Sequence, residues 1–443
     1  MTSAAARALA ATRAADYVKR LGRINRLVGL TVESTGPAAR LGEVCEILAR
    51  ASGTCTLAEV VGFAESRVLL MPYDEPVGLS VGDEVVATGR SAEVLAGDHL
   101  LGRVIDGFGA PLDGRPLQQD GTHCPIYPVP IQPLQRGTAC EVLETGIRAI
   151  DSLLTLTRGQ RVGIFAGSGV GKSTVLGMLA REVRTDVSVI ALVGERGREV
   201  RAFVESGLSE AARAKSVVIA ATSDQPPLVR RRAAFLATAV AEYFRDRGLH
   251  VCLLMDSVTR VAMAQREIGL ASGELPTARG YTPSVFTLLP RLLERGGVRA
   301  AGGSLTGLYT VLVEGDDLTD PISDSVRSIL DGHIVLSRAI AQRGRYPAVD
   351  ITQSVSRLAS LVASEAEARL MTETVRLLAA YETSRDLIEV GAYRAGTNVT
   401  VDRAIKLVPQ IEKFLAQKPA DVERRAASLE RLRKIVEEPV RAA

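Results

Sequence analysis

Tryptophan is absent from the 443-residue sequence, and the other large aromatic residues are few, with 8 Phe and 9 Tyr. Proteins that bind single-stranded nucleic acid without sequence preference stack the bases on aromatic side chains, so this composition argues against such a platform. The formal net charge is only +3, which is too small to indicate nucleic acid or an anionic membrane surface as a partner. We therefore expect no nucleic-acid partner.

The cysteines and the apolar residues also lack the arrangements that mark secreted and membrane proteins. The five cysteines are scattered, with no CxxC pair and no histidines at zinc-site spacing. Such a set is typical of free thiols in a reducing compartment. No apolar run approaches the roughly 20 residues of a membrane span, and the chain does not begin with a secretory signal peptide. These absences predict a cytoplasmic protein.

The residue pattern changes three times along the chain, which predicts four segments. Residues 1–20 form a helix-prone arm that is either disordered or an amphipathic segment that orders on a partner. Residues 21–92 contain short β runs separated by glycine, and we expect a small β-barrel with a structural or oligomer-forming role. Residues 93–360 form an α/β core, and residues 361–443 form a helical domain. The β runs are LVGLTVES, GEVCEIL, AEVVGF, RVLLMPY and DEVVATG.

In the core, apolar strands alternate with helical stretches, which is the pattern of a parallel sheet covered by helices. The expected strands are Arg161–Phe165, Val187–Val193, Val217–Ala221, Val251–Met255 and Leu308–Val313. The preceding stretch, Leu100–Leu117, is rich in turn residues, and we expect it to be a connector.

One glycine-rich stretch, IFAGSGVGKST, joins an expected strand to a strong helix former. Glycine tolerates the backbone angles that let successive N–H groups point at a phosphate, and the following helix adds the positive end of its dipole. We therefore predict a phosphate loop that binds ATP, with Lys172 on the β- and γ-phosphates and the Ser173 hydroxyl on Mg²⁺. The expected nucleotide contacts are Ala166, Gly167, Ser168, Gly169, Val170, Gly171, Lys172, Ser173 and Thr174.

Two further strands lead to acidic residues at the sheet edge where parallel α/β folds bind ligands. The strand HVCLLMD ends at Asp256, whose carboxylate we expect to hold Mg²⁺ through water. The strand VIALV precedes Glu195, a candidate to polarise the water that attacks the γ-phosphate, and Arg196, a candidate phosphate contact. From the pattern alone, a surface glutamate in a charged turn explains Glu195 equally well.

Five longer stretches carry a resemblance to a known family: AGSGVGKST, GERGREV, MDSVTRVAMAQREIGLASGELPTARGYTPSVF, EGDDLTDPISDSVRSILDGHIVLSR and YPAVDITQSVSR. From about residue 22 to 420 the chain resembles the type III protein-export ATPases, most of all the flagellar member, which are relatives of rotary ATP synthase catalytic subunits. The resemblance implies a RecA-like P-loop NTPase core with a parallel sheet, preceded by a small N-terminal β-barrel and followed by a C-terminal helical domain. It also implies that Glu195 is the catalytic carboxylate, that Lys172 and Ser173 contact phosphate and magnesium, and that Asp256 is the strand-end acid.

Two further roles rest on the resemblance alone. Arg357 in SVSR matches the arginine finger that a neighbouring subunit supplies, and Tyr346 in RYPAVD matches the residue that stacks on adenine. Without the resemblance, we would interpret Arg357 as a helix-surface arginine and Tyr346 as a half-buried tyrosine. The sequence departs from the synthase pattern in KFLAQKPADVERR, where no aromatic residue follows Phe414. We therefore expect the nucleobase to be held less tightly on that side, which puts adenine selectivity in question.

A site completed by a neighbour implies a ring, and the resemblance makes that ring a homohexamer. The segment Leu270–Tyr281 contains two glycines and a proline, and we expect it to line the central pore and to move with nucleotide state. The family suggests that ATP hydrolysis energises flagellar protein export, with exported proteins and their chaperones released or unfolded at the pore. The other implied partners are a regulator or stator-like export protein on residues 1–20 and the membrane export gate, which places the chain at the inner face of the cell membrane.

Three alternatives remain. A virulence-type III secretion ATPase carries the same motifs, and genomic neighbours rather than residues would distinguish it. A Rho-like ring that translocates nucleic acid would need an aromatic or basic face on the barrel, which the sequence lacks. A non-catalytic nucleotide-binding subunit of a rotary machine would lack the carboxylate that Glu195 supplies.

Overall fold

The computed structural model describes residues 21–118, 120–129 and 131–437. These residues divide into two compact units. One unit comprises the chain up to Glu93 together with Pro226–Leu228 and Glu267–Leu275, and the other comprises the remainder. The arm expected at residues 1–20 lies outside the described residues. None of the described helices combines the length and the apolar character that a membrane crossing requires.

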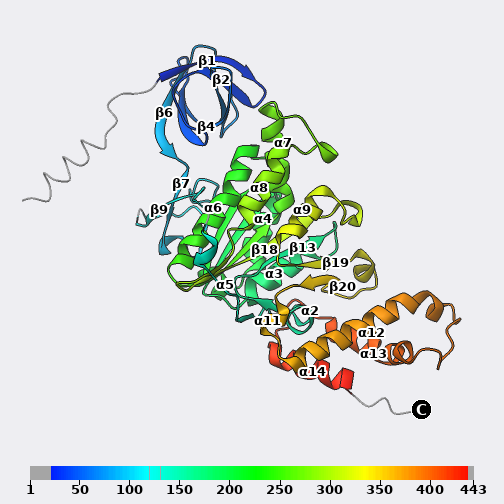
Figure 1. Ribbon diagram of the computed structural model, residues 1–443. Coiled ribbons are helices and arrows are strands. Elements are labelled where there is room, and N and C mark those ends of the chain that lie inside the picture. The colour runs from blue at the N-terminus through cyan, green and yellow to red at the C-terminus, as the bar shows by residue number, and fades with distance from the viewer. Residues whose placement is uncertain (1–20, 119, 130, 438–443) are drawn as a thin grey trace, which may run out of the picture. The chain divides into compact units, whose positions relative to one another are not determined.

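The first unit contains the expected barrel, which has six antiparallel strands (Figure 1). The strands pair in the closed order β1-β2-β5-β4-β3-β6, and β6 pairs back with β1. Alternate residues of a strand such as β3 are buried, as a small barrel filled by side chains requires. The six strands are β1 (Leu21–Val28), β2 (Thr31–Thr35), β3 (Glu43–Leu48), β4 (Cys55–Ala64), β5 (Arg67–Pro72) and β6 (Glu84–Ser91).

The prediction of a single strand over LVGLTVES is wrong. Gly29 has a φ of 57°, in the left-handed region that favours glycine, and the chain reverses there. The stretch therefore contributes the end of β1 and the start of β2, which pair with each other through Val28 and Thr31.

The second unit is built on a mostly parallel sheet with the strand order β20-β19-β13-β18-β16-β14-β15-β8. All pairings along this path are parallel except that of β20 with β19. The strands are β8 (Arg103–Ile105), β13 (Arg161–Ala166), β14 (Val187–Val193), β15 (Ser216–Ala221), β16 (His250–Asp256), β18 (Ser304–Leu312), β19 (Gly332–Leu336) and β20 (Val349–Ser356). The five expected core strands are present, and β19 and β20 are additions.

The stretch Leu100–Leu117 is more than the expected connector, because its residues Arg103–Ile105 form β8. This strand pairs in parallel with β15 and extends the sheet at that edge. Its three residues are too few for any periodicity to be read from the sequence.

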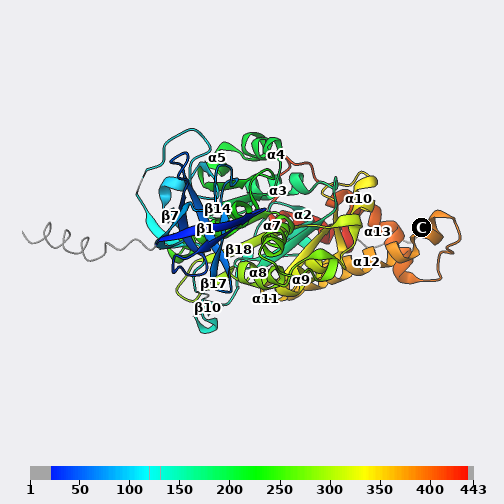
Figure 2. The same ribbon diagram turned by 90° about the horizontal axis from the view of Figure 1, so that it is seen from above.

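Helices cover both faces of the sheet because its right-handed connections run in two directions. The chain passes from β13 to β14 and β15 in one direction, through α3 (Lys172–Glu182), α4 (Gly197–Ala202) and α5 (Glu210–Ala214). It returns from β16 to β18 and β19 in the other direction, so that α8 (Pro283–Leu293) and α9 (Pro321–Ile329) lie on the opposite face (Figure 2). The remaining long helices of this region are α6 (Pro227–Asp246) and α7 (Val258–Ala271).

The chain ends in the expected helices, α11 (Ala359–Val362), α12 (Glu365–Glu389), α13 (Val399–Leu415) and α14 (Arg425–Glu437), and the last three pack together (Figure 1). A capping box between Ser364 and Glu367 starts α12. On α13, Leu407, Ile411 and Phe414 recur at helical spacing and join the apolar core of the sheet domain. The remaining short helices and strands include α2 (Arg148–Leu153), α10 (Arg338–Gln342), β7 (Glu93–Ala96), β9 (Thr122–Pro125), β10 (Arg136–Gly137), β11 (Val142–Leu143), β12 (Leu156–Thr157) and β17 (Gly297–Arg299).

Candidate nucleotide site

The predicted phosphate loop connects the buried strand β13 to the first turn of α3. Gly169 and Gly171 have φ values of 79° and 94°, which residues with a Cβ rarely adopt. A Cβ on Gly167 would lie 2.3 Å from Oδ1 of Asp316, so a side chain there would have to displace the Asp316 carboxylate. The backbone can thus direct its N–H groups and the positive end of α3 toward an anion.

Lys172, the first residue of α3, lies between two carboxylates from neighbouring strands. Its ammonium donates hydrogen bonds to Oε1 of Glu195 at 3.0 Å and to Oδ1 of Asp256 at 2.5 Å. Asp256 ends β16 and Glu195 follows β14 by two residues, and these strands are paired in parallel. Because parallel strands end at the same sheet edge, Glu195 and Asp256 meet at one ammonium although they lie far apart in the sequence.

Burial controls the charges of this cluster. The pKa of the Asp256 carboxyl is raised above its usual value, mainly because the group is buried. The Lys172 ammonium lowers this pKa and the Glu195 carboxylate raises it further. For Lys172, burial lowers the pKa, but the two carboxylates raise it by more. The lysine therefore keeps its positive charge at neutral pH, and a bound phosphate would meet a fixed cation.

A cavity of about 740 Å³ lies over the loop. Of the nine predicted loop residues, only Val170 is missing from its lining, because its side chain is buried in the core. Arg196 lines the rim; its side chain is 67% exposed and pairs with Glu199 at 3.6 Å. The cavity thus combines backbone donors with positive side chains, as a polyphosphate site requires.

The residues present also fit a magnesium ion. The Ser173 hydroxyl and the Asp256 carboxylate both line an adjoining cavity of about 420 Å³, together with Glu195. Magnesium prefers oxygen ligands and is usually held by one or two protein oxygens together with substrate phosphates and water. Ser173 and Asp256 are thus a suitable donor pair beside the phosphate loop.

The sequence interpretation missed Arg260. Arg260 lies on the first turn of α7 and lines the larger cavity. Its side chain packs close to Gly194, because a Cβ added to Gly194 would lie 2.8 Å from the Cβ of Arg260. Its Nε is buried and has no hydrogen-bond partner among the described residues. The available signal was its position four residues after Asp256, which puts it one helical turn beyond the strand end.

Tyr346 lies beside the start of α3. A Cβ on Gly171 would be 3.5 Å from Cδ1 of Tyr346, and the tyrosine side chain is well exposed at 44%. The Tyr346 carbonyl accepts a hydrogen bond from the Gln417 N–H at 2.8 Å, and Pro419 lines the smaller cavity. The segment after Phe414, in which we expected no aromatic contact, therefore lies next to Tyr346.

Arg357 is not brought to this cavity within the described chain. It follows the end of β20, is exposed, and donates from Nη1 to the carbonyl of Leu330 at 3.1 Å. Its interpretation as an arginine that acts outside its own subunit is compatible with this position, but the position alone assigns it no ligand.

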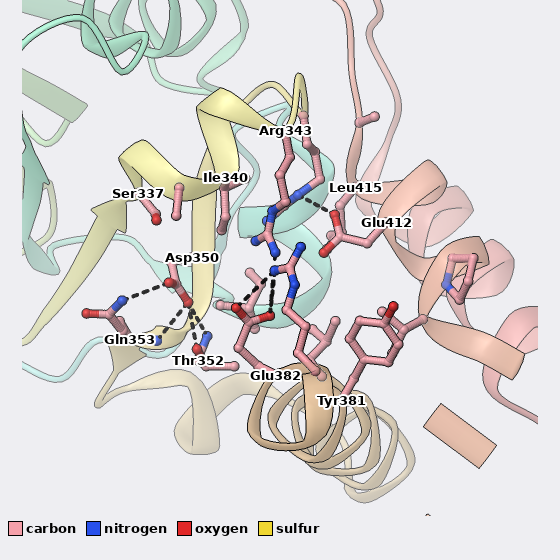
Figure 3. Close-up of a pocket in the computed structure, with 18 of the residues that line it drawn as sticks. Ser337, Ile340, Arg343, Asp350, Thr352, Gln353, Tyr381, Glu382, Glu412 and Leu415 are labelled. Atoms are coloured by element: carbon pink, nitrogen blue, oxygen red, sulfur yellow. Dashed lines mark hydrogen bonds and ion pairs between the residues drawn. The ribbon is translucent and has the colours of Figure 1, made fainter. Parts of the chain in front are cut away.

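A third cavity, of about 590 Å³, lies between α10, β20, α12 and α13 (Figure 3). Its arginines pair with its glutamates, Arg345 with Glu412 at 2.5 Å and Arg385 with Glu382 at 3.2 Å, and Asp350 accepts hydrogen bonds from Thr352 and Gln353. Burial raises the pKa of both glutamates. With its charges paired internally, this cavity marks where the C-terminal helices pack on the core, and we assign no ligand to it.

Comparison with protein families divides the chain into three parts. The family model described as "ATP synthase alpha/beta family, nucleotide-binding domain" matches residues 146–356. The "ATP synthase alpha/beta family, beta-barrel domain" matches residues 24–89, and the "T3SS EscN ATPase C-terminal domain" matches residues 363–434.

The chain is 51% identical over 418 residues to the flagellum-specific ATP synthase of Bacillus subtilis, which covers 94% of this chain and 95% of that protein. It is 48% identical over 403 residues to the type 3 secretion system ATPase of Xanthomonas euvesicatoria, with 91% of each chain covered. Among solved structures, the assembled ATPase EscN of the enteropathogenic E. coli type III secretion system aligns with a TM-score of 0.89 at 43% identity, covering 94% of this chain and 100% of that one. EscN in complex with its central stalk EscO aligns with a TM-score of 0.85 at 42% identity and the same coverage.

Proposed function

The chain belongs to the family of flagellum-specific ATP synthases and type 3 secretion system ATPases, and on this premise we propose that it works as a homohexameric ring that energises flagellar protein export. As a member of this family it is an ATPase of the export apparatus. We further propose that release or unfolding of exported proteins and chaperones takes place at the pore of the ring.

The observation that carries the proposed chemistry is the position of the Lys172 ammonium between Glu195 and Asp256. In the proposed reaction, Lys172 and the loop N–H groups hold the β- and γ-phosphates of ATP, and Arg196 contacts phosphate at the rim. Glu195 accepts a proton from the attacking water as the bond from the γ-phosphorus to the bridging oxygen breaks, which yields ADP and phosphate. Ser173 and Asp256 would hold Mg²⁺, which supplies neutralisation of phosphate charge.

Nucleotide contacts beyond the phosphates are proposed on the same basis. Ala166 to Thr174 surround the phosphates, with Val170 contributing its backbone only, and the Tyr346 ring stacks on the base. Pro419, which lines the adjoining cavity, offers an aliphatic surface, and no aromatic residue follows Phe414 in this segment. Base selectivity is therefore expected to rest mainly on Tyr346.

The ring proposal rests on Arg357. This arginine is exposed and lies away from the cavity of its own subunit, while the cavity is open to solvent beside Arg196. A homohexamer in which Arg357 reaches the neighbour's γ-phosphate would supply the missing transition-state charge. EscN, to which the chain is similar, is an assembled ATPase.

The proposed coupling to export runs through the turn that contains Arg279. This side chain pairs with Asp317 at 2.8 Å and with Asp320 at 3.1 Å. The loop that carries these aspartates begins at Glu314, which lines the nucleotide cavity. Tyr281, in contrast, is buried, so we propose that the residues before it contact exported protein. Loss of export with normal ATPase activity in Arg279→Ala would support this coupling, and normal export would refute it.

Partners and location are proposed from the family. A regulator would dock on residues 1–20, which lie outside the described part of the chain, and a stalk protein would dock as EscO does on EscN. The ring would work in the cytoplasm at the inner face of the membrane export gate. We propose domain boundaries after residues 20, 92 and 360, which truncated variants can test.

A virulence-type export ATPase is the main alternative, because the chain is also similar to type 3 secretion ATPases. A Rho-like translocase predicts that RNA stimulates hydrolysis, and an assay with added RNA tests this directly. Export of flagellar proteins in a strain that lacks the gene separates the flagellar proposal from the virulence one.

The decisive experiment measures ATPase activity against protein concentration, with size-exclusion profiles, for the wild type and Glu195→Gln. We expect specific activity to rise as the ring assembles. Glu195→Gln should bind a fluorescent ATP analogue normally and hydrolyse ATP at least about 100-fold more slowly. Activity that is independent of concentration would rule out the shared-site ring, and normal hydrolysis by Glu195→Gln would rule out the assigned base.

A further inference from the structure

The strand order puts β18 between the phosphate-loop strand and the strand that ends at Asp256. On one side Thr310 of β18 is in register with Ile164 of β13, and on the other side Tyr309 is in register with Met255 of β16. Thr310 is fully buried, with no exposed surface. A polar residue thus occupies a central strand directly beneath the proposed catalytic cluster, where an apolar residue would satisfy packing alone.

The Thr310 hydroxyl makes a specific contact there. Its Oγ1 donates to Oδ1 of Asp256 at 2.6 Å, whereas the carbonyl of Met255 lies farther away, at 3.4 Å. A hydroxyl has one proton to donate, so the shorter contact to the carboxylate is the one that receives it. Lys172 donates to the same oxygen, so both described hydrogen bonds to this carboxylate fall on Oδ1. Oδ2 is left for the cavity that Asp256 lines with Ser173.

The two donors differ in rigidity. Lys172 reaches Asp256 through a long side chain with several rotatable bonds, and the proposed reaction needs its ammonium at the phosphates. Thr310 is β-branched, which restricts χ1, and it sits on a strand that is paired on both sides. When Lys172 turns to the phosphates, the hydrogen bond from Thr310 is the contact that still fixes the carboxylate.

We propose that Thr310 is a positioning residue, which holds Asp256 by Oδ1 and thereby presents Oδ2 to the hydrated Mg²⁺ of the bound nucleotide. The inference rests on the proposed role of Asp256. Hydrogen-bonded partners of metal-binding carboxylates orient the ligand, and their loss typically lowers metal affinity or activity by about 10- to 100-fold.

Thr310→Val tests the proposal because it removes the hydroxyl at nearly constant shape. ADP binding is measured by calorimetry with and without Mg²⁺, and ATP hydrolysis is measured as Mg²⁺ is varied. We expect binding without Mg²⁺ to be unchanged, the gain in affinity from Mg²⁺ to fall by about tenfold or more, and half-saturation to need at least about tenfold more Mg²⁺. The kcat at saturating Mg²⁺ should change much less, and Thr310→Ser should restore the wild-type Mg²⁺ dependence.

Thr306→Val is the matched control. Thr306 is a buried threonine on the same strand, and its hydroxyl accepts a hydrogen bond from the Gly159 N–H at 2.8 Å, away from the cluster. An unchanged Mg²⁺ dependence in Thr306→Val supports the proposal, and a shift equal to that of Thr310→Val overturns it as a general effect of the strand. A wild-type Mg²⁺ dependence in Thr310→Val also overturns it.

Asp256→Asn distinguishes a failure of the proposed role of Thr310 from a failure of the proposed role of Asp256. If Asp256→Asn abolishes the Mg²⁺ dependence and Thr310→Val does not change it, the proposed function stands and the inference about Thr310 fails. If Asp256→Asn behaves as the wild type, the proposed role of Asp256 fails and the inference fails with it.

Discussion

Mixing two inactive variants provides the sharpest test of the shared site. Glu195→Gln removes the proposed base from the subunit that holds the phosphate loop, and Arg357→Ala removes the arginine that the neighbour would supply. Within one described chain, the Arg357 guanidinium contacts the Leu330 carbonyl at 3.1 Å and is not part of the cavity that Glu195 lines. The two residues of a working site should therefore come from two different subunits.

The geometry of a closed ring sets the size of the effect. Loss of an arginine finger costs about 10³–10⁵ in rate, so pure Arg357→Ala should have at most about 0.1% of wild-type activity. Loss of the proposed base costs at least about 100-fold, so pure Glu195→Gln should have at most about 1%. In rings assembled from equal amounts of both variants, about half of the subunits carry Glu195 and about half of their neighbours carry Arg357. About a quarter of the interfaces are then intact, which sets an upper limit of about 25% of wild-type activity.

The assay follows phosphate release after the two variants are mixed, dissociated by dilution and reassembled by concentration. We expect ATPase activity at least about 10-fold above the sum of the two pure variants. It should stay below the limit of about 25% if the intact sites of a ring depend on their inactive neighbours. The control mixture combines Glu195→Gln with Lys172→Ala. Lys172 Nζ and Glu195 Oε1 lie 3.0 Å apart in the same subunit, so no subunit of this mixture has both residues and ATPase activity should not recover. Absence of recovery in the first mixture, with normal assembly on size exclusion, would refute the shared site.

Three further predictions concern binding and stability. Tyr346→Ala should raise the KM for ATP about tenfold or more at nearly constant kcat, because the exposed ring offers about 1–3 kcal/mol of base stacking, and Tyr346→Phe should keep the wild-type KM. Arg148→Ala should lower the free energy of unfolding in urea by about 1–3 kcal/mol, because it removes a buried guanidinium that donates to the carbonyls of Phe414 and Ala416 and pairs with half-buried Glu423 at 2.9 Å. Arg431→Ala, which removes an exposed partner of the same glutamate, should cost less than about 1 kcal/mol. Burial raises the pKa of Asp151 from 3.8 to about 6, so its folded pKa lies above the unfolded one. Stability from this group is complete below about pH 4 and is lost, by up to about 3 kcal/mol, as pH rises through about 6, and urea unfolding of Asp151→Asn should show a flatter pH dependence than the wild type.

Features that depend on contiguous residues follow from the sequence. A phosphate loop binds its ligand with consecutive backbone N–H groups, so the spacing of Gly167, Gly169 and Gly171 before Lys172 is visible in the chain itself. The buried strands before Glu195 and Asp256 are likewise continuous apolar runs, and parallel sheets expose the ends of such strands at one edge. For the same reason, periodicity alone separates the barrel, the α/β core and the terminal helices.

What only the tertiary structure decided is the set of contacts made between distant residues. The order of strands is a global property, since any of several apolar runs could pair with β13, and the folded chain places β18 there and brings Thr310 to Asp256. The three residues of β8 lie in a turn-rich stretch and become a strand because β15 offers an open edge. Arg357 can be identified from a motif, but only the folded chain shows that its guanidinium contacts the Leu330 carbonyl and does not line the cavity of its own subunit. Local pattern thus predicted candidate residues for the chemistry, and the pairing of strands decided which of them meet. Side-chain contacts across a sheet are fixed by the pairing of whole strands and not by any short stretch of chain.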